Sequence, residues 1–138
     1  MGLDVTFKNA INGPIDAVRV PSRIIVASNA AGYGAHGYTE RWRYTVPAGK
    51  RALVKMLYFY VDQTVANEDI GEKVLYTPAG GAAVHVARAM SLATQYYSPT
   101  FTPDMVMLAG DALSGETRNN VGIVYTEECT AIIEEYDI

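Results

Sequence analysis

Apolar and polar residues alternate along much of the chain, and this period of two predicts β-strands. Near the start, Leu3, Val5 and Phe7 alternate with polar residues, as expected for a strand with one buried face. Turn-forming pairs such as Gly110-Asp111 separate the segments. Many short strands divided by turns favour a sandwich or barrel over alternating strands and helices. The pattern predicts strands at residues 3–7, 23–27, 41–46, 51–61, 73–77, 105–109, 121–127 and 130–136.

The clearest turn lies at residues 46–50 (VPAGK), where proline presets one φ angle and glycine tolerates a positive one. It joins two predicted strands, so we expect residues 40–61 to form a β-hairpin. Residues 82–97 are ambiguous, because their apolar positions fit both a helix and a strand; we favour a strand. The prediction therefore allows one short helix or long loop around residues 82–104.

The strand predicted at residues 51–61 is apolar on both faces. Its odd positions are apolar except Lys55, and its even positions include Met56, Tyr58 and Tyr60. A strand in an isolated sandwich has one face on the core and the other toward water, so the second face needs a cover. A loop or helix of the same chain could supply it, and so could a neighbouring subunit. The sequence leaves both open, although Tyr and Met are enriched in interface cores.

With 138 residues and a mass of 15.0 kDa, the chain is expected to form one domain spanning residues 1–138. Its formal charge of -4 argues against a nucleic-acid partner, which needs a basic surface. The longest uninterrupted apolar run, residues 56–61, is too short to cross a membrane, so no membrane partner is expected. Cys129 is the only cysteine, which gives no disulfide framework and indicates synthesis in a reducing cytoplasm.

No group of residues in the sequence predicts a catalytic or ligand-binding site. Residues 32–37 match G-x-G-x-x-G, but a predicted strand follows them, so the phosphate-binding helix terminus is missing. His36 and His85 are the only histidines, and they show no metal-ligand spacing. Cys129 has no recognisable base, and adjacent glutamates near the C-terminus should point to opposite strand faces. We therefore expect a non-enzymatic protein with no catalytic residues, no cofactor and no metal.

Charge is distributed unevenly along the chain. Residues 40–55 contain five basic residues and one acid, a balance of +4, whereas residues 116–138 contain six acids and one base, a balance of -5. Two solvated strand faces would explain this distribution. Alternatively, the basic segment of one copy contacts the acidic C-terminal strands of the next, and such head-to-tail contacts close a ring if the rotation between copies allows.

Two parts of the chain resemble small jelly-roll structural proteins of tailed bacteriophages. Residues 44–52 (YTVPAGKRA) are similar to their opening strands, and residues 108–113 (LAGDAL) with the closing residues 131–137 (AIIEEYD) are similar to their last strands. The family includes capsid decoration, or cement, proteins. The resemblance implies an all-β antiparallel sandwich of jelly-roll type and a homo-oligomer, most often a trimer. It further implies binding to the major capsid protein on the outside of the head shell, and hence a virion location.

Candidate contact residues follow from this interpretation. We expect Arg41, Arg43, Tyr58 and Tyr60 to form the self-assembly interface, with Trp42 in the core. The shell contact is expected at the N-terminal strand and at the loop from Tyr33 to Tyr38, because termini and long loops often order on binding. Other virion roles, such as a head-fibre base, a minor capsid protein or a tail component, remain alternatives. So does a carbohydrate-binding module, because exposed aromatic side chains stack on sugars.

Overall fold

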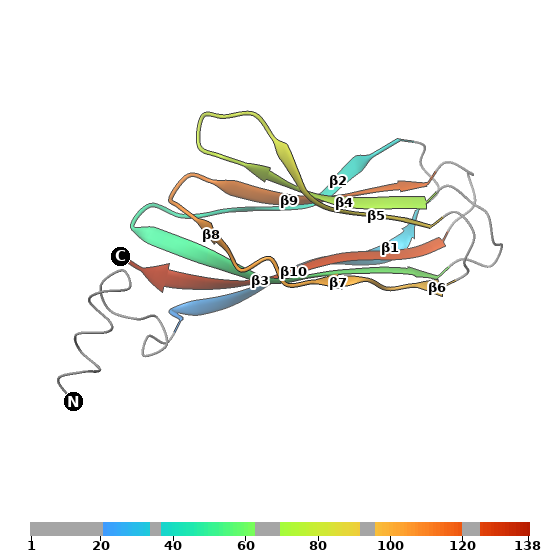
Figure 1. Ribbon diagram of the computed structural model, residues 1–138, viewed down its shortest axis with the longest axis horizontal. Helices are drawn as coiled ribbons and strands as arrows, with labels where there is room; N and C mark the ends of the chain where they lie inside the picture. The colour runs from blue at the N-terminus through green and yellow to red at the C-terminus, as the bar shows by residue number, and fades with distance from the viewer. Residues whose placement is uncertain (1–20, 34–36, 63–69, 92–95, 120–124) are drawn as a thin grey trace.

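The computed structural model describes residues 21–33, 37–62, 70–91, 96–119 and 125–138, which form ten β-strands and no helix (Figure 1). The strand expected at residues 3–7 lies outside the described residues. The strand preferred over residues 82–97 is confirmed for residues 84–91. The strands are β1 (Arg23–Tyr33), β2 (Thr39–Thr45), β3 (Lys50–Asp62), β4 (Ile70–Thr77), β5 (Val84–Ser91), β6 (Tyr96–Tyr97), β7 (Thr100–Phe101), β8 (Met105–Met107), β9 (Ala112–Asn119) and β10 (Tyr125–Asp137).

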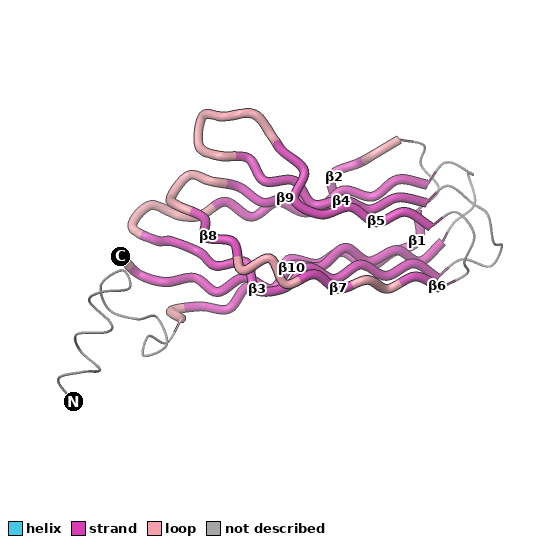
Figure 2. Tube along the Cα trace, viewed as in Figure 1, coloured by secondary structure: helices cyan, strands magenta, loops and turns pink. Residues whose placement is uncertain are grey.

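The strands form two antiparallel sheets that pack face to face in two layers (Figure 2). The six-stranded sheet has the order β1-β10-β3-β6, with β7 and β8 also pairing with β3. The four-stranded sheet has the order β2-β9-β4-β5. Because β6, β7 and β8 together act as one interrupted edge strand, this is the eight-strand arrangement of a jelly roll. The predicted all-β jelly-roll sandwich is therefore confirmed.

The predicted hairpin over residues 40–61 is wrong, although its turn is correct. Gly49 has a φ of 76°, and the Lys50 amide donates a hydrogen bond to the Pro47 carbonyl over 3.2 Å. However, β2 pairs with β9 and β3 pairs with β10, so the turn crosses from one sheet to the other. A local turn signal fixes the reversal of the chain but not the partners of the flanking strands, which packing around the shared core decides.

The last part of the chain also differs from the prediction. The two strands expected at residues 121–127 and 130–136 belong, over their described part, to the single strand β10. Strand β9 was not predicted, because its sequence ALSGETRN lacks an apolar alternation. Its inward position Gly115 carries no side chain and packs directly against the indole of Trp42. The apolar side chain that fills this position therefore comes from β2, namely Trp42.

A β-bulge in β3 explains why that strand is apolar on both faces. The register with β10 shifts so that Val54 pairs with Ile133 while Met56 pairs with Ile132, which leaves Lys55 as the extra residue. The inward-pointing side chains consequently switch from even to odd positions at the bulge. Before the bulge the even positions Ala52 and Val54 are buried, and after it the odd positions are buried, namely Leu57, Phe59 and Val61.

The core lies between the two sheets, and Phe59 and Leu57 are its largest fully buried side chains. Phe59 packs edge-to-face on Phe101, with ring centroids 5.8 Å apart. Trp42 packs against the core, as expected, and its indole nitrogen donates a hydrogen bond to the Cys129 carbonyl over 2.6 Å. The two sheets are thus joined by both apolar packing and a buried hydrogen bond.

Candidate functional site

The four residues predicted for self-assembly lie on two different sheets. Arg41 and Arg43 belong to β2 of the four-stranded sheet, whereas Tyr58 and Tyr60 belong to β3 of the six-stranded sheet. Arg43 forms an ion pair with Glu40 over 2.7 Å, which raises the pKa of Arg43 through the hydrogen bond to that carboxylate. The structure does not bring these four residues into one patch, and their role in assembly stays a prediction.

Arg41 occupies the β2 bulge, where the register with β9 shifts between Glu40 and Trp42. Its Nε donates a hydrogen bond over 2.8 Å to the hydroxyl of Thr117, a fully buried side chain. The Arg41 side chain therefore reaches toward the interior of the sandwich, and this interaction also gives it a structural role.

Tyr38, one of the two predicted shell contacts, lies on the outer side of the four-stranded sheet. Its hydroxyl packs against Gly71, where a Cβ atom would clash with it. The ammonium of Lys73 lies 4.0 Å from the ring centroid, and the guanidinium carbon of Arg118 lies 4.9 Å from it. For Tyr33 the structure gives only the backbone, which pairs with Tyr125 in β1 and β10. Residues 34–36 lie outside the described residues.

The outer face of the four-stranded sheet is charged. Lys73 on β4 and Glu116 on β9 pair across neighbouring strands over 2.9 Å. Arg43 and Glu40 lie on β2, and Arg88 is exposed on β5. Such a face is typical of the solvated side of a sandwich.

The outer face of the six-stranded sheet carries exposed aliphatic side chains next to a few charged ones. Val26, Ile132 and Met56 follow one another in register across β1, β10 and β3. Leu53 pairs with Val106 of β8. The side chains of Val26 and Val106 are 62% and 58% exposed, and no described strand covers this side in Figure 1. We call this surface the outer apolar face; it consists of Ile24, Val26, Leu53, Met56, Val106 and Ile132.

Charged groups also lie on this side of the six-stranded sheet, with Glu134 in register between Ile24 and Leu53, and they have partners within the chain. Glu134 accepts a hydrogen bond from the Tyr136 hydroxyl over 2.7 Å. Lys55, the bulge residue, forms an ion pair with Asp104 over 2.9 Å, and this contact raises the pKa of Lys55. Glu128 accepts a hydrogen bond from a neighbouring threonine on β10. Contact with this face therefore need not leave these groups without a partner.

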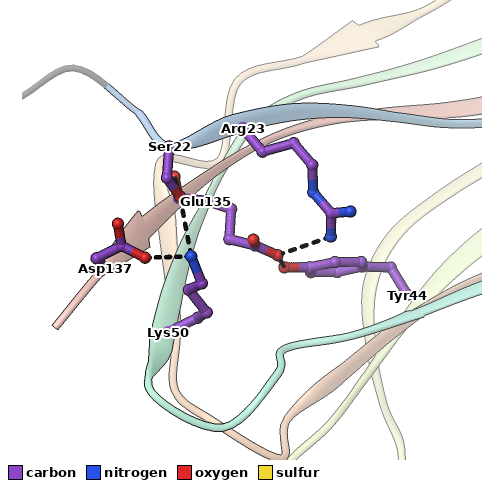
Figure 3. Close-up of polar contacts among 6 residues, drawn as sticks. All are labelled: Ser22, Arg23, Tyr44, Lys50, Glu135 and Asp137. Atoms are coloured by element: carbon purple, nitrogen blue, oxygen red, sulfur yellow. Dashed lines mark hydrogen bonds and ion pairs between the residues drawn. The ribbon is translucent and has the colours of Figure 1, made fainter.

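A buried polar cluster joins β10 to β1 and β2 at the end of the sandwich that carries the C-terminus (Figure 3). Glu135, 3% exposed, accepts hydrogen bonds from the Tyr44 hydroxyl over 2.7 Å and from Arg23 over 3.1 Å. Burial alone raises the pKa of Glu135, but these donors and the charges of Arg23 and Lys50 outweigh it and lower that pKa. Burial and the Glu135 carboxylate raise the pKa of Tyr44. Lys50 pairs with Asp137 beside this cluster.

A second buried carboxylate fastens two turns at the same end of the molecule. Asp111 accepts hydrogen bonds from the backbone amides of Ala79 and Leu108, each over 2.9 Å, and from the Tyr76 hydroxyl over 2.8 Å. Burial raises the pKa of Asp111, yet the three donors outweigh burial and hold it below its ordinary value. A carboxylate with this many donors is suited to holding loops and not to proton transfer.

Cys129, the candidate nucleophile, and His85, the histidine that the structure describes, lie in different environments. Cys129 is fully buried, and burial raises the pKa of its thiol, which keeps it protonated at neutral pH. His85 is exposed on β5. Within the described ranges, no three His, Cys, Asp or Glu side chains gather as a metal site. The same part of the chain contains no helix that is long and apolar enough to cross a membrane.

No family model matches the sequence, and neither does any curated protein. Among solved structures, the chain is similar to Yersinia pseudotuberculosis-derived mitogen, at 12% identity and a TM-score of 0.42, over 81% of this chain and 86% of that one. It is similar to a chain of infectious bursal disease virus, Gt strain, at 12% identity and a TM-score of 0.46. That match covers 86% of this chain but only 34% of the viral one.

A third similar structure is TmCBM61, in complex with beta-1,4-galactotriose, at 10% identity and a TM-score of 0.39. The match covers 89% of this chain and 94% of that one. At these identities and TM-scores the similarities carry no argument about function. The fold assignment rests on the strand order of the chain itself.

Sequence reasoning identified the second apolar face of β3 but missed its extent. The contributions of Ile24, Val26 and Val106 were not recognised, because single strands do not show which residues become neighbours across a sheet. The available signal was an apolar residue at a position where an alternating strand would carry a polar one. It was visible in residues 23–27, where Ile24, Ile25 and Val26 follow one another.

Proposed function

We propose that this protein is a non-catalytic structural component of a virus particle, namely a capsid decoration (cement) protein that binds the outside of a phage head shell. The observation that carries the proposal is the outer apolar face, which contrasts with the charged face of the other sheet. An exposed apolar surface of this kind marks an interaction site. A decoration protein needs a rigid β core with broad contact surfaces, and many copies stabilise a shell through multivalent contacts.

Two kinds of contact belong to this proposal. Self-assembly, proposed as a trimer, uses the six-stranded sheet, on which Tyr58 and Tyr60 border the outer apolar face. The shell contact, with the major capsid protein as partner, uses Tyr33 and Tyr38. Tyr38 supports this assignment because its ring is held, half-buried, on the outer side of the four-stranded sheet by the cations of Lys73 and Arg118.

The test is binding to particles. Shells that lack the protein should bind it in many copies on their outer surface, visible by electron microscopy, and should then resist heating better than undecorated shells. The Tyr38→Ala variant is expected to bind at least about 10-fold more weakly, a loss of ~1.4 kcal/mol. Thr100→Ala, which changes an exposed residue of the other sheet, is the control and should bind normally. Absence of the protein from all particles would contradict the proposal.

The same experiment separates decoration from other virion roles. A head-fibre base or a minor capsid protein would occupy a few positions on the head instead of covering its surface, and a tail component would be found on tails. Finding the protein at any of these locations would rule out the decoration role but would still support a structural role in the virion.

A carbohydrate-binding module is the second candidate, and one observation favours it. Tyr58 and Tyr60 are two positions apart on the same outward side of β3, which places two aromatic rings about 7 Å apart. Rings in such a row stack on consecutive sugar units. Binding on a glycan array that is lost in the Tyr58→Ala variant would favour this function, and an array without binding would remove it.

A further inference from the structure

We propose that strand β1 opens from the sandwich while the other strands stay folded, and that the contacts of Ser22 and Arg23 with Glu135 form the latch that keeps it closed. The opening concerns one edge strand and does not depend on the proposed function. It would uncover the backbone edge of β10, which pairs with all 11 residues of β1.

Strand β1 is held on one side only and buries little. It forms the edge of the six-stranded sheet, and among the described strands it pairs with β10 alone. The structure describes its side chains over residues 23–27, and none of these is fully buried. Ile24 and Val26 are each 62% exposed, whereas Ile25 and Ala27 are partly buried at the border of the core. An edge segment with so few buried apolar contacts opens at a low cost in free energy.

The neighbouring strand β10 is fixed more firmly, because it lies between β1 and β3. Its inward side chains that pair with described residues of β1 are almost fully buried, at 3% exposure for Glu135 and 0% for Ile133 and Ala131. Removal of β1 would leave β10 in its ladder with β3. Opening of β1 therefore requires less free energy than unfolding of the sandwich.

Polar contacts fasten the start of β1. The amide and the hydroxyl of Ser22 both donate hydrogen bonds to the Glu135 carbonyl, over 2.7 Å and 2.9 Å. The Arg23 guanidinium donates to the Glu135 carboxylate over 3.1 Å. Lys50, which pairs with Asp137, also donates to the Ser22 hydroxyl over 3.4 Å (Figure 3). Because these contacts lie where β1 begins, their loss frees the strand at its first residues.

The Glu135 carboxylate keeps a partner when β1 leaves, because β2 also holds it. The Tyr44 hydroxyl donates over 2.7 Å to the same carboxylate oxygen that accepts from Arg23. Opening therefore avoids the costly outcome of a broken ion pair, which is a buried charge without a partner. Arg23 is 59% exposed, so its ion pair holds β1 only modestly. A latch of this strength can open and close reversibly.

Amide hydrogen exchange, followed by NMR in the unmodified protein, tests the opening. The amides through which β1 pairs with β10 should exchange at least about 100-fold faster than those through which β10 pairs with β3, because only the second set requires global unfolding. Both sets belong to antiparallel ladders of the same sheet, so they are matched in kind. Equal exchange rates in the two sets would overturn the proposal.

Thiol labelling tests the latch. An Ala27→Cys variant places a thiol on the inward side of β1, and an Ala52→Cys variant places one on β3, where the native side chain is 1% exposed. Cys129 is fully buried and protonated, so the introduced thiol dominates the reaction. Adding Arg23→Gln should speed labelling of the Ala27→Cys variant about 5-fold and leave the Ala52→Cys variant unchanged. An unchanged rate in the first variant, or an equal rise in both, would overturn the proposal.

Lys55→Gln is the matched control. It also removes a partly exposed cation from an ion pair of the six-stranded sheet, but at the bulge of β3, with β10 between it and β1. It should not change the labelling of the Ala27→Cys variant. A rise equal to that caused by Arg23→Gln would show that the latch is not specific and would overturn the proposal.

Salt provides an independent readout of the ion pair. Raising the salt concentration from about 0.05 M to about 1 M should speed labelling of the Ala27→Cys variant about 3-fold, because the exposed Arg23 is screened from Glu135. The effect should disappear when Arg23→Gln is added. A salt dependence that persists in Arg23→Gln would show that this ion pair is not the latch.

The proposed function fails or stands separately. A strand β1 that never opens would overturn this inference and leave the expected binding to particles unchanged. A protein that is absent from particles but whose β1 opens as described would overturn the function alone.

Discussion

The Gly115→Ala variant is expected to lose about 3 kcal/mol of folding free energy. A Cβ atom at this position would overlap the edge of the Trp42 indole, which lies against the core and donates to the Cys129 carbonyl. Moving the ring strains a packed interior, which costs roughly 1–3 kcal/mol, and weakens a hydrogen bond worth about 1 kcal/mol. Chemical denaturation measures the loss, and fluorescence of Trp42, the only tryptophan, reports on the displaced ring.

Two matched variants make this prediction specific. Gly71→Ala also introduces a clash, but with the hydroxyl end of a half-exposed tyrosine that can swing away, so it should cost less than about 1 kcal/mol. In a Trp42→Phe background the indole edge is absent, and Gly115→Ala should then add little further loss. Equal losses from Gly115→Ala in both backgrounds would contradict the proposed contact.

The Glu135→Ala variant should lose roughly 2–3 kcal/mol at neutral pH, because it removes the acceptor of the buried Tyr44 hydroxyl and of Arg23. The loss should depend on pH. The pKa of Glu135 is lowered by folding, so its contribution is fully present above its unfolded pKa of about 4.3 and disappears as the pH falls through the folded value. The difference between variant and unmodified protein should therefore shrink below about pH 4.

Denaturant titrations at neutral and acidic pH measure this difference. Glu134→Ala is the matched control, because Glu134 lies on the outward side of the same strand and remains partly exposed. It should cost less than about 1 kcal/mol at neutral pH. A loss from Glu135→Ala that stays constant from neutral to acidic pH would show that the carboxylate charge does not stabilise the fold.

Alternation and turn chemistry were sufficient to predict the sandwich, since most predicted strands exist within the described residues. They failed where a residue's role depends on another strand. At the inward position Gly115, the apolar side chain that packs there belongs to Trp42 of the neighbouring strand. The β9 sequence therefore lacks the alternation that predicts a strand. The hairpin over residues 40–61 failed for the same reason, because the sequence of the turn does not specify which strands pair.

The candidate site was only partly predictable. The sequence showed that β3 has a second apolar face. The bulge at Lys55 explains why both the even and the odd positions of this strand are apolar. It did not show that Arg41 would reach toward buried Thr117 or that Arg43 would lie on the opposite sheet from Tyr58. Interactions between residues more than 70 positions apart depend on topology, which periodicity does not encode.

The most direct measurement for the central claim is the mass of the unmodified protein in solution. Sedimentation at micromolar concentration should give a species of about 45 kDa, three times the 15.0 kDa of one chain, because the proposed self-assembly is a closed trimer. A single species of one chain's mass that does not change with concentration would contradict the account.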